Sequence, residues 1–123
     1  MANLELKNVD KVYEDGFQAV KNINIKSEEK EFIVLVGPSG SGKSTTLRLI
    51  AGLEDVSSGD LFIDGEKITE LDPKNRDIAM VFQSYALYPH MTVRKNMTFA
   101  LKLSGISKSE RNKIADQVAE ALD

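Results

Sequence analysis

The most informative residues for chemistry form one consecutive run, Gly37-Pro38-Ser39-Gly40-Ser41-Gly42-Lys43-Ser44. The run fits the pattern G-x-x-x-x-G-K-[ST], in which glycines let the backbone turn so that successive N–H groups point at phosphate oxygens. Lys43 would supply a positive charge to the β and γ phosphates, and the Ser44 hydroxyl suits the coordination shell of Mg²⁺. Thr45 can donate to the α phosphate. The run therefore predicts a site for the triphosphate of a purine nucleotide, with ATP and Mg²⁺ as the expected ligands.

The segments on either side of this loop are predicted to be a strand and a helix, as a phosphate loop requires. Phe32 to Val36 is a continuous apolar run of β-forming residues, as expected for a strand covered on both faces. Thr45 to Ala51 is predicted to be a helix with Gly52 as its stop. The positive end of such a helix would lie beneath the bound anion. Strand, glycine loop and helix follow one another in the order that a phosphate loop needs.

Further strands are predicted before and after the loop. Alternating apolar residues indicate one strand from Leu4 to Tyr13 and another around Val20 to Ile25. Asp64-Gly65 is a strong hairpin signal after the short strand 60–63. Asp77 to Phe82 is a further apolar strand candidate, with Gln83 at its carboxyl end, where open α/β sheets commonly place ligand contacts.

The last part of the chain changes to helical periodicity. Thr92 and Ser107 are suitable N-caps for two helices, the second with Glu110 three residues on. We therefore predict an α/β fold. Residues 1–83 would form an antiparallel β layer and a P-loop core with a parallel sheet, and residues 84–123 would begin a helical subdomain.

Composition narrows the class of protein. The 123 residues are 41% hydrophobic and 28% charged, the balance of a soluble globular domain. The net charge of −3 argues against a nucleic-acid partner, which usually selects a basic excess. The absence of cysteine excludes disulfides and thiolate chemistry. The apolar run 32–36 is far too short to span a bilayer, so a membrane role would require docking on a partner.

Several segments together resemble one family, the ATP-binding-cassette (ABC) ATPases. These segments are Gly37 to Thr45 (GPSGSGKST), Leu47 to Leu53 (LRLIAGL), Ser58-Gly59 and Val81-Phe82-Gln83. The stretch from Asn75 to Val93 (NRDIAMVFQSYALYPHMTV), together with Lys11-Val12-Tyr13, resembles the subgroup that drives bacterial sugar importers of the maltose and multiple-sugar type. Related polyamine and metal importers are similar here. The resemblance covers essentially the whole chain and corresponds to the N-terminal half of the nucleotide-binding domain.

The resemblance implies roles for individual residues. Tyr13 matches the aromatic residue that stacks on adenine, and Gln83 matches the glutamine that contacts Mg²⁺ and the attacking water. The predicted catalytic residues are thus Lys43 and Gln83, and the predicted metal contacts are Ser44 and Gln83. Without the resemblance, Tyr13 would be interpreted as a packed aromatic and Gln83 as a solvated loop residue. His90 is expected to be a surface or interface residue, because no nucleophile and base surround it in the sequence.

The resemblance also implies partners. Two such subunits form a head-to-tail dimer that encloses ATP, and Tyr85 to Val93 match the segment that meets the transmembrane permease subunits. The protein would then be cytoplasmic and peripheral on the inner face of the cell membrane. Lys95 departs from the acidic residue common before Asn96-Met97 in relatives, which leaves the membrane contact less defined and the nucleotide site untouched.

Four parts of an ABC ATPase have no match in these 123 residues. They are the signature loop, the acidic strand that holds Mg²⁺ through water, the general-base glutamate and the switch histidine. We therefore expect the intact protein to be an ATPase and this chain alone to bind ATP with little turnover. Two alternatives remain: a different P-loop enzyme such as a small-molecule kinase, for which no acceptor site is visible, and a soluble ABC-type ATPase not linked to transport.

Overall fold

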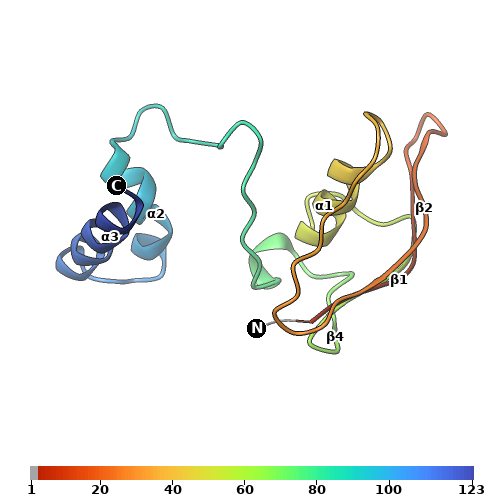
Figure 1. Ribbon diagram of the computed structural model, residues 1–123, viewed down its shortest axis with the longest axis horizontal. Helices are drawn as coiled ribbons and strands as arrows, with labels where there is room; N and C mark the ends of the chain where they lie inside the picture. The colour runs from red at the N-terminus through yellow and green to blue at the C-terminus, as the bar shows by residue number, and fades with distance from the viewer. Residues whose placement is uncertain (1–2) are drawn as a thin grey trace. The chain divides into compact units, whose positions relative to one another are not determined.

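The computed structural model describes residues 3–123 as two compact units, one ending at Met80 and the other beginning at Val81 (Figure 1). The first unit holds a sheet, one α-helix and a short 3₁₀ helix, and the second holds two α-helices. The α/β class predicted from the sequence is confirmed. The assignment of residues 1–83 and 84–123 to two parts of a nucleotide-binding domain stays a prediction.

The sheet of the first unit contains β1 (Leu4–Val12), β2 (Gln18–Lys26), β3 (Ser58–Ile63) and β4 (Glu66–Lys67). The strand order is β2-β1-β3-β4, and every neighbouring pair is antiparallel. In the central strand, Leu6 lies opposite Ile25 on one side and Leu61 on the other. The antiparallel β layer, including the hairpin at Asp64-Gly65, is therefore present as predicted.

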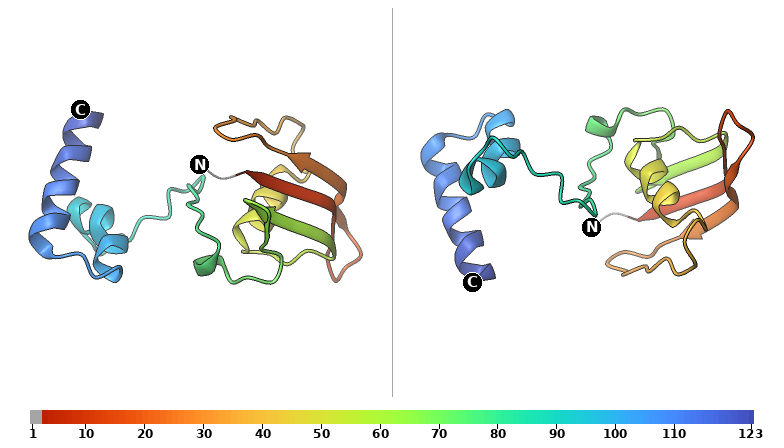
Figure 2. Two further views of the ribbon diagram at one scale, coloured as in Figure 1. Left: turned by 90° about the horizontal axis from the view of Figure 1, so that it is seen from below. Right: turned by 90° about the horizontal axis from the view of Figure 1, so that it is seen from above.

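One helix, α1 (Lys43–Ala51), covers one face of this sheet, as both views of Figure 2 show. Leu49 of α1 is fully buried among the sheet residues Leu6, Val9, Val20 and Leu61. Thr46 and Leu49 are the buried residues of α1, whereas Leu47 is 50% exposed. The helix begins at Lys43, two residues earlier than predicted.

The carboxyl end of α1 is held by a buried arginine. Arg76 follows the short helix η1 (Pro73–Asn75) and is only 4% exposed. Its guanidinium donates to four carbonyls, those of Leu49 (2.9 Å), Ile50 (3.1 Å), Leu71 (2.8 Å) and Thr69 (3.1 Å). Burial lowers the pKa of Arg76, which the Asp55 carboxylate opposes. The cation complements the negative end of the helix dipole and ties the segment 69–76 to α1.

Two predicted strands are not strands in this structure. Phe32 to Val36 and Asp77 to Phe82 form no β-ladder with another segment among residues 3–123, so the predicted parallel core sheet is absent there. Phe32 and Val36 are each 89% exposed, and Val81 is 87% exposed. A β-strand is defined by its backbone hydrogen bonds to neighbouring strands. The four antiparallel strands form these bonds with one another. The β-forming composition of these runs was identified correctly, whereas their pairing depends on other segments.

The second unit is an α-hairpin formed by α2 (Val93–Leu103) and α3 (Lys108–Leu122). Both predicted N-caps are present: the Thr92 hydroxyl accepts from the Lys95 N–H at 3.2 Å, and the Ser107 hydroxyl accepts from the Glu110 N–H at 3.3 Å. Arg94 and Asp116 join the two helices by an ion pair of 2.7 Å. Among residues 3–123, none of the helices combines the length and apolar character needed to cross a bilayer.

Candidate nucleotide-binding site

The predicted phosphate loop forms a pocket at the amino end of α1. Two glycines make the turn possible, because Gly40 (φ 81°) and Gly42 (φ 87°) adopt the left-handed conformation that other residues avoid. The first intrahelical bond is from the Thr46 N–H to the Gly42 carbonyl at 2.8 Å. The N–H groups of the preceding first-turn residues have no partner within the helix and are therefore available to an anion.

The pocket has a volume of about 310 Å³. Seven of the nine predicted loop residues line it: Ser39, Gly40, Ser41, Gly42, Lys43, Ser44 and Thr45. Gly37 and Pro38 do not line the pocket but accept hydrogen bonds from Lys43 through their carbonyls, at 2.7 and 2.6 Å. The loop residues predicted from the sequence are thus brought together in one place.

Lys43 lies at the centre of this loop. Besides the two carbonyls, its ammonium group donates to the Ser41 hydroxyl at 3.0 Å. These three acceptors are all uncharged, so the positive charge of Lys43 is not neutralised by a carboxylate of the described chain. An ammonium surrounded by neutral dipoles retains its full attraction for an added anion. This arrangement can therefore attract an added anion such as a phosphate group.

The loop is anchored to β2 through a close approach at Gly42. A β-carbon at this position would collide with the carbonyl oxygen of Ala19, so only glycine fits. At Gly37, a β-carbon would come within 2.7 Å of the Ser41 hydroxyl. Glycine is therefore required at Gly37 by a contact within the loop, and at Gly42 by a contact with the sheet.

The donor set at the pocket is compatible with Mg²⁺ held mainly by a nucleotide. Ser44 is exposed in the first turn of α1 and lines the pocket, so its hydroxyl oxygen is accessible as a hard ligand. Residues 3–123 contain no group of three or more histidine, aspartate or glutamate side chains that could hold a metal ion by themselves. Phosphate oxygens and water would have to complete the shell, as Mg²⁺ commonly requires.

Two aromatic residues come from the turn between β1 and β2. The Tyr13 N–H donates to the Phe17 carbonyl at 2.9 Å, and the Gly16 N–H donates to the Tyr13 carbonyl at 2.9 Å. Tyr13 is half-buried, and Phe17 is 55% exposed and lines the pocket together with Ala19. Phe17 and Ala19 were not predicted as site residues. An aromatic directly after the turn signal Asp15-Gly16 and directly before β2 is the signal that could have identified Phe17.

Gln83 belongs to the second unit and begins a tight turn over residues 83–86. Two non-glycine residues of this turn, Tyr85 (φ 63°) and Ala86 (φ 49°), are left-handed. Such backbone strain is held only where the surrounding structure requires it, and it is common in functional segments. The contacts predicted for Gln83 with Mg²⁺ and water stay predictions.

The segment from Tyr85 to Val93 presents apolar side chains to solvent. Tyr85, Leu87 and Val93 are between 67% and 77% exposed. The segment is fastened to α2 by Asn96, whose amide accepts from the Tyr88 N–H at 2.8 Å and donates to the Tyr88 carbonyl at 3.1 Å. The ring of His90 packs edge-on against Tyr88 at 6.1 Å. A firmly held loop with exposed apolar residues is typical of a surface that binds another protein.

Comparison with known proteins agrees with this geometry. Residues 20–123 match the ABC transporter family. The trehalose import ATP-binding protein SugC of Mycobacterium tuberculosis is 54% identical over 123 residues, which are 100% of this chain and 31% of that protein. The maltose/maltodextrin import ATP-binding protein MalK of Mannheimia succiniciproducens is 54% identical over 99% of this chain and 32% of its own length. The oligosaccharides import ATP-binding protein MsmX of Bacillus subtilis is 52% identical, with 99% and 33% covered.

The solved structures give the same result for the fold. The dimeric, post-hydrolysis structure of the ATP-binding cassette MJ0796 bound to ADP and Pi matches with a TM-score of 0.83 and 37% identity, covering 93% of this chain and 54% of that one. The chain spans about a third of the length of the curated relatives it matches. The resemblance predicted from the phosphate loop and from the Asn75–Val93 stretch is confirmed, and the chain belongs to the ABC transporter family.

Proposed function

We propose that this chain is the ATP-binding portion of the ATPase subunit of an ABC importer that takes up carbohydrate. The observation that carries the proposal is the phosphate loop at the amino end of α1, with the Lys43 ammonium at its centre and no carboxylate among residues 3–123 to neutralise it. The carbohydrate class rests on relatives that are described as trehalose, maltose/maltodextrin and oligosaccharide import proteins.

In the proposed complex, the loop residues bind and orient the triphosphate. Lys43 would exchange its two carbonyl partners for β- and γ-phosphate oxygens, and the N–H groups of Ser44 and Thr45 would donate to phosphate oxygens at the positive end of α1. The Ser44 hydroxyl and the Gln83 amide would hold the metal. When bound, Mg²⁺ would offset the negative charge of the phosphates. Gln83 would also orient the attacking water, since its amide offers both a donor and an acceptor.

Thermal unfolding with and without Mg-ATP tests the nucleotide site. Ligand at one hundred times its dissociation constant adds about 2.7 kcal/mol to the stability of the folded state. Lys43→Ala should abolish that shift. Lys113→Ala, an exposed lysine on α3, is the matched control and should keep it. A full shift in Lys43→Ala would show that the loop is not the site.

Binding and turnover are expected to separate in this chain. The loop makes its contacts with the bound ground state, whereas the signature loop and the general-base glutamate act on the transition state. Loss of a single transition-state donor typically lowers the rate by about 10²–10³. The 123-residue chain should therefore bind Mg-ATP and release phosphate at the background rate. Steady release of phosphate that disappears in Lys43→Ala would contradict this assignment of roles.

The segment from Tyr85 to Val93 supports transport rather than a soluble ABC-type function. Its exposed apolar residues and its fastening by Asn96 suit a docking site for transmembrane permease subunits, which would place the protein on the cytoplasmic face of the membrane. The dimeric state of the related cassette supports a second ATPase subunit as a further partner. Co-purification with the permease subunits, lost in a Leu87→Asp variant and kept in Lys113→Ala, tests the docking site.

A further inference from the structure

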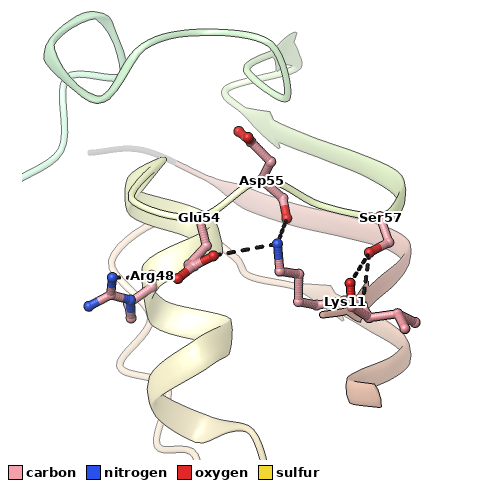
Figure 3. Close-up of polar contacts among 6 residues, drawn as sticks. Lys11, Arg48, Glu54, Asp55 and Ser57 are labelled. Atoms are coloured by element: carbon pink, nitrogen blue, oxygen red, sulfur yellow. Dashed lines mark hydrogen bonds and ion pairs between the residues drawn. The ribbon is translucent and has the colours of Figure 1, made fainter. Parts of the chain in front are cut away.

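Lys11 of β1 lies against Tyr13, the residue that the family resemblance assigns to the base of the nucleotide. Its side chain is 13% exposed, and its ammonium donates to the Asp55 carbonyl at 2.7 Å (Figure 3). The same group lies 3.4 Å from a Glu54 carboxylate oxygen and 5.1 Å from the centroid of the Tyr13 ring. A single buried cation thus contacts a carbonyl, a carboxylate and an aromatic face.

The carbonyl and the carboxylate belong to the segment that follows α1. Glu54 pairs also with Arg48 of α1 at 3.5 Å, so this carboxylate is shared between the helix and the strand (Figure 3). Two residues further on, the Ser57 hydroxyl accepts from the Val12 N–H at 2.8 Å and donates to the Val12 carbonyl at 3.2 Å. The end of β1 is therefore fastened to the segment 54–57 that follows α1, and through Glu54 to Arg48 of the helix itself.

The contact with Tyr13 has a direct physical effect on stacking. A cation within about 6 Å of a tyrosine ring is attracted by the negative π face. Because Lys11 is held by Glu54 and Asp55, that attraction fixes the ring instead of drawing the lysine toward it. One face of the ring is taken by the ammonium, so a nucleobase would have to stack on the opposite face. The charge also withdraws electron density from the ring, which favours stacking on an electron-rich base.

We infer that Lys11 is a positioning residue that fixes Tyr13, and with it the base of the nucleotide, relative to the phosphate loop. The inference rests on the proposed function and on the role that the family resemblance implies for Tyr13, stacking on the base. The lysine itself touches neither base nor phosphate. Its loss should weaken only the part of the affinity that depends on the base.

The test compares a ligand that has a base with one that has none. Binding of Mg-ATP and of Mg-tripolyphosphate is measured by calorimetry for the wild type, Lys11→Met, Lys11→Arg, Tyr13→Ala and the double variant Lys11→Met/Tyr13→Ala. Lys11→Met should weaken ATP binding by about three- to tenfold and leave tripolyphosphate binding within twofold. Lys11→Arg, which keeps the cation, should restore ATP binding. In the Tyr13→Ala background, Lys11→Met should have no further effect.

The outcomes separate this inference from the proposed function. Equal weakening of both ligands by Lys11→Met, or full additivity with Tyr13→Ala, would overturn the positioning role. Failure of the wild type to bind tripolyphosphate would overturn the phosphate site itself. If Lys11→Met does not fold, as judged by its thermal melt, Glu54→Gln replaces it. Glu54→Gln removes the ion pair of Lys11 and should then weaken the binding of ATP but not that of tripolyphosphate. Weaker binding of both ligands would contradict the inference.

Discussion

Gly52 and Arg76 lie in direct contact at the end of α1. A β-carbon at Gly52 would come within 2.7 Å of Arg76 Nε and 2.8 Å of Cζ. Gly52 is also the left-handed C-cap of the helix, with φ 76°. The absence of a side chain at Gly52 therefore permits the left-handed turn. It also makes room for the guanidinium that donates to the last carbonyls of α1.

Removal of the guanidinium should strongly destabilise the first unit. Arg76→Met would leave four largely buried carbonyls without their donor, and we expect a loss of about 2–4 kcal/mol in the free energy of unfolding. Urea denaturation measures this loss. Arg48→Met is the control: Arg48 has 45% of its side chain exposed and pairs with Glu54 at 3.5 Å, so its loss should cost less than about 1 kcal/mol. Equal losses in the two variants would contradict the role given to Arg76.

Two glycine substitutions separate backbone strain from steric collision. Gly52→Ala and Gly105→Ala both place alanine at a left-handed position, φ 76° and 79°, but only Gly52 has neighbours within 4 Å of the added carbon. Gly105→Ala should lose about 1–2 kcal/mol from strain alone. Gly52→Ala should lose clearly more, because Arg76 must move. Similar unfolding midpoints for the two variants would show that Arg76 moves away from the added carbon at little cost in free energy.

The choice of base should be weak and should depend on aromatic residues. Stacking uses the face of the base rather than its hydrogen-bonding edges, so ATP and GTP should bind within roughly tenfold. Tyr13→Ala and Phe17→Ala should each weaken both nucleotides together. Competition against a fluorescent nucleotide would measure the affinities. A strong preference for GTP that survives both substitutions would indicate a pocket that recognises the hydrogen-bonding edges of the base, and would contradict stacking.

Acid should destabilise the β layer in part through Asp10. Its carboxylate accepts from the Asn22 N–H at 3.0 Å, from the Ser58 hydroxyl at 3.0 Å and from the Gln18 amide at 3.1 Å, and these bonds lower the pKa of Asp10 below 3.8. A carboxyl with a lower pKa in the folded state stabilises the fold above the unfolded-state pKa and stops doing so as the pH falls through the folded-state pKa. Asp10→Asn should flatten the fall in stability below about pH 4. Parallel stability curves for the two proteins would exclude this contribution.

The sequence identified the site more completely than the fold around it. The loop residues that the structure brings together were predicted from sequence spacing, because the loop glycines and Lys43 serve local geometry, while their role in binding nucleotide stays a prediction. The antiparallel strands and the N-caps Thr92 and Ser107 were predicted for the same reason. The pairing partners of a strand could not be predicted, because nothing within Phe32 to Val36 specifies which segment completes its hydrogen bonds.

Residues that act at a distance were also missed. Lys11 and Arg76 were noticed only as parts of a family resemblance, because their partners lie 44 residues away for the Lys11–Asp55 hydrogen bond and 27 for the Arg76–Leu49 bond. No periodicity or local motif reports contacts over such separations. Phe17 was overlooked because a single aromatic after a turn is ordinary in sequence, and only the closure of the sheet places it at the pocket.

The exposed run from Phe32 to Val36 affects how the molecule should behave in solution. Five uncharged β-forming residues without proline, whose backbone groups pair with no strand in the described part of the chain, make a template for strand addition between molecules. Preparations of this chain should therefore self-associate as the protein concentration rises, and light scattering should increase before any ligand is added. Titrations with nucleotide are best interpreted below that concentration, where the phosphate loop is measured on single molecules and not on aggregates.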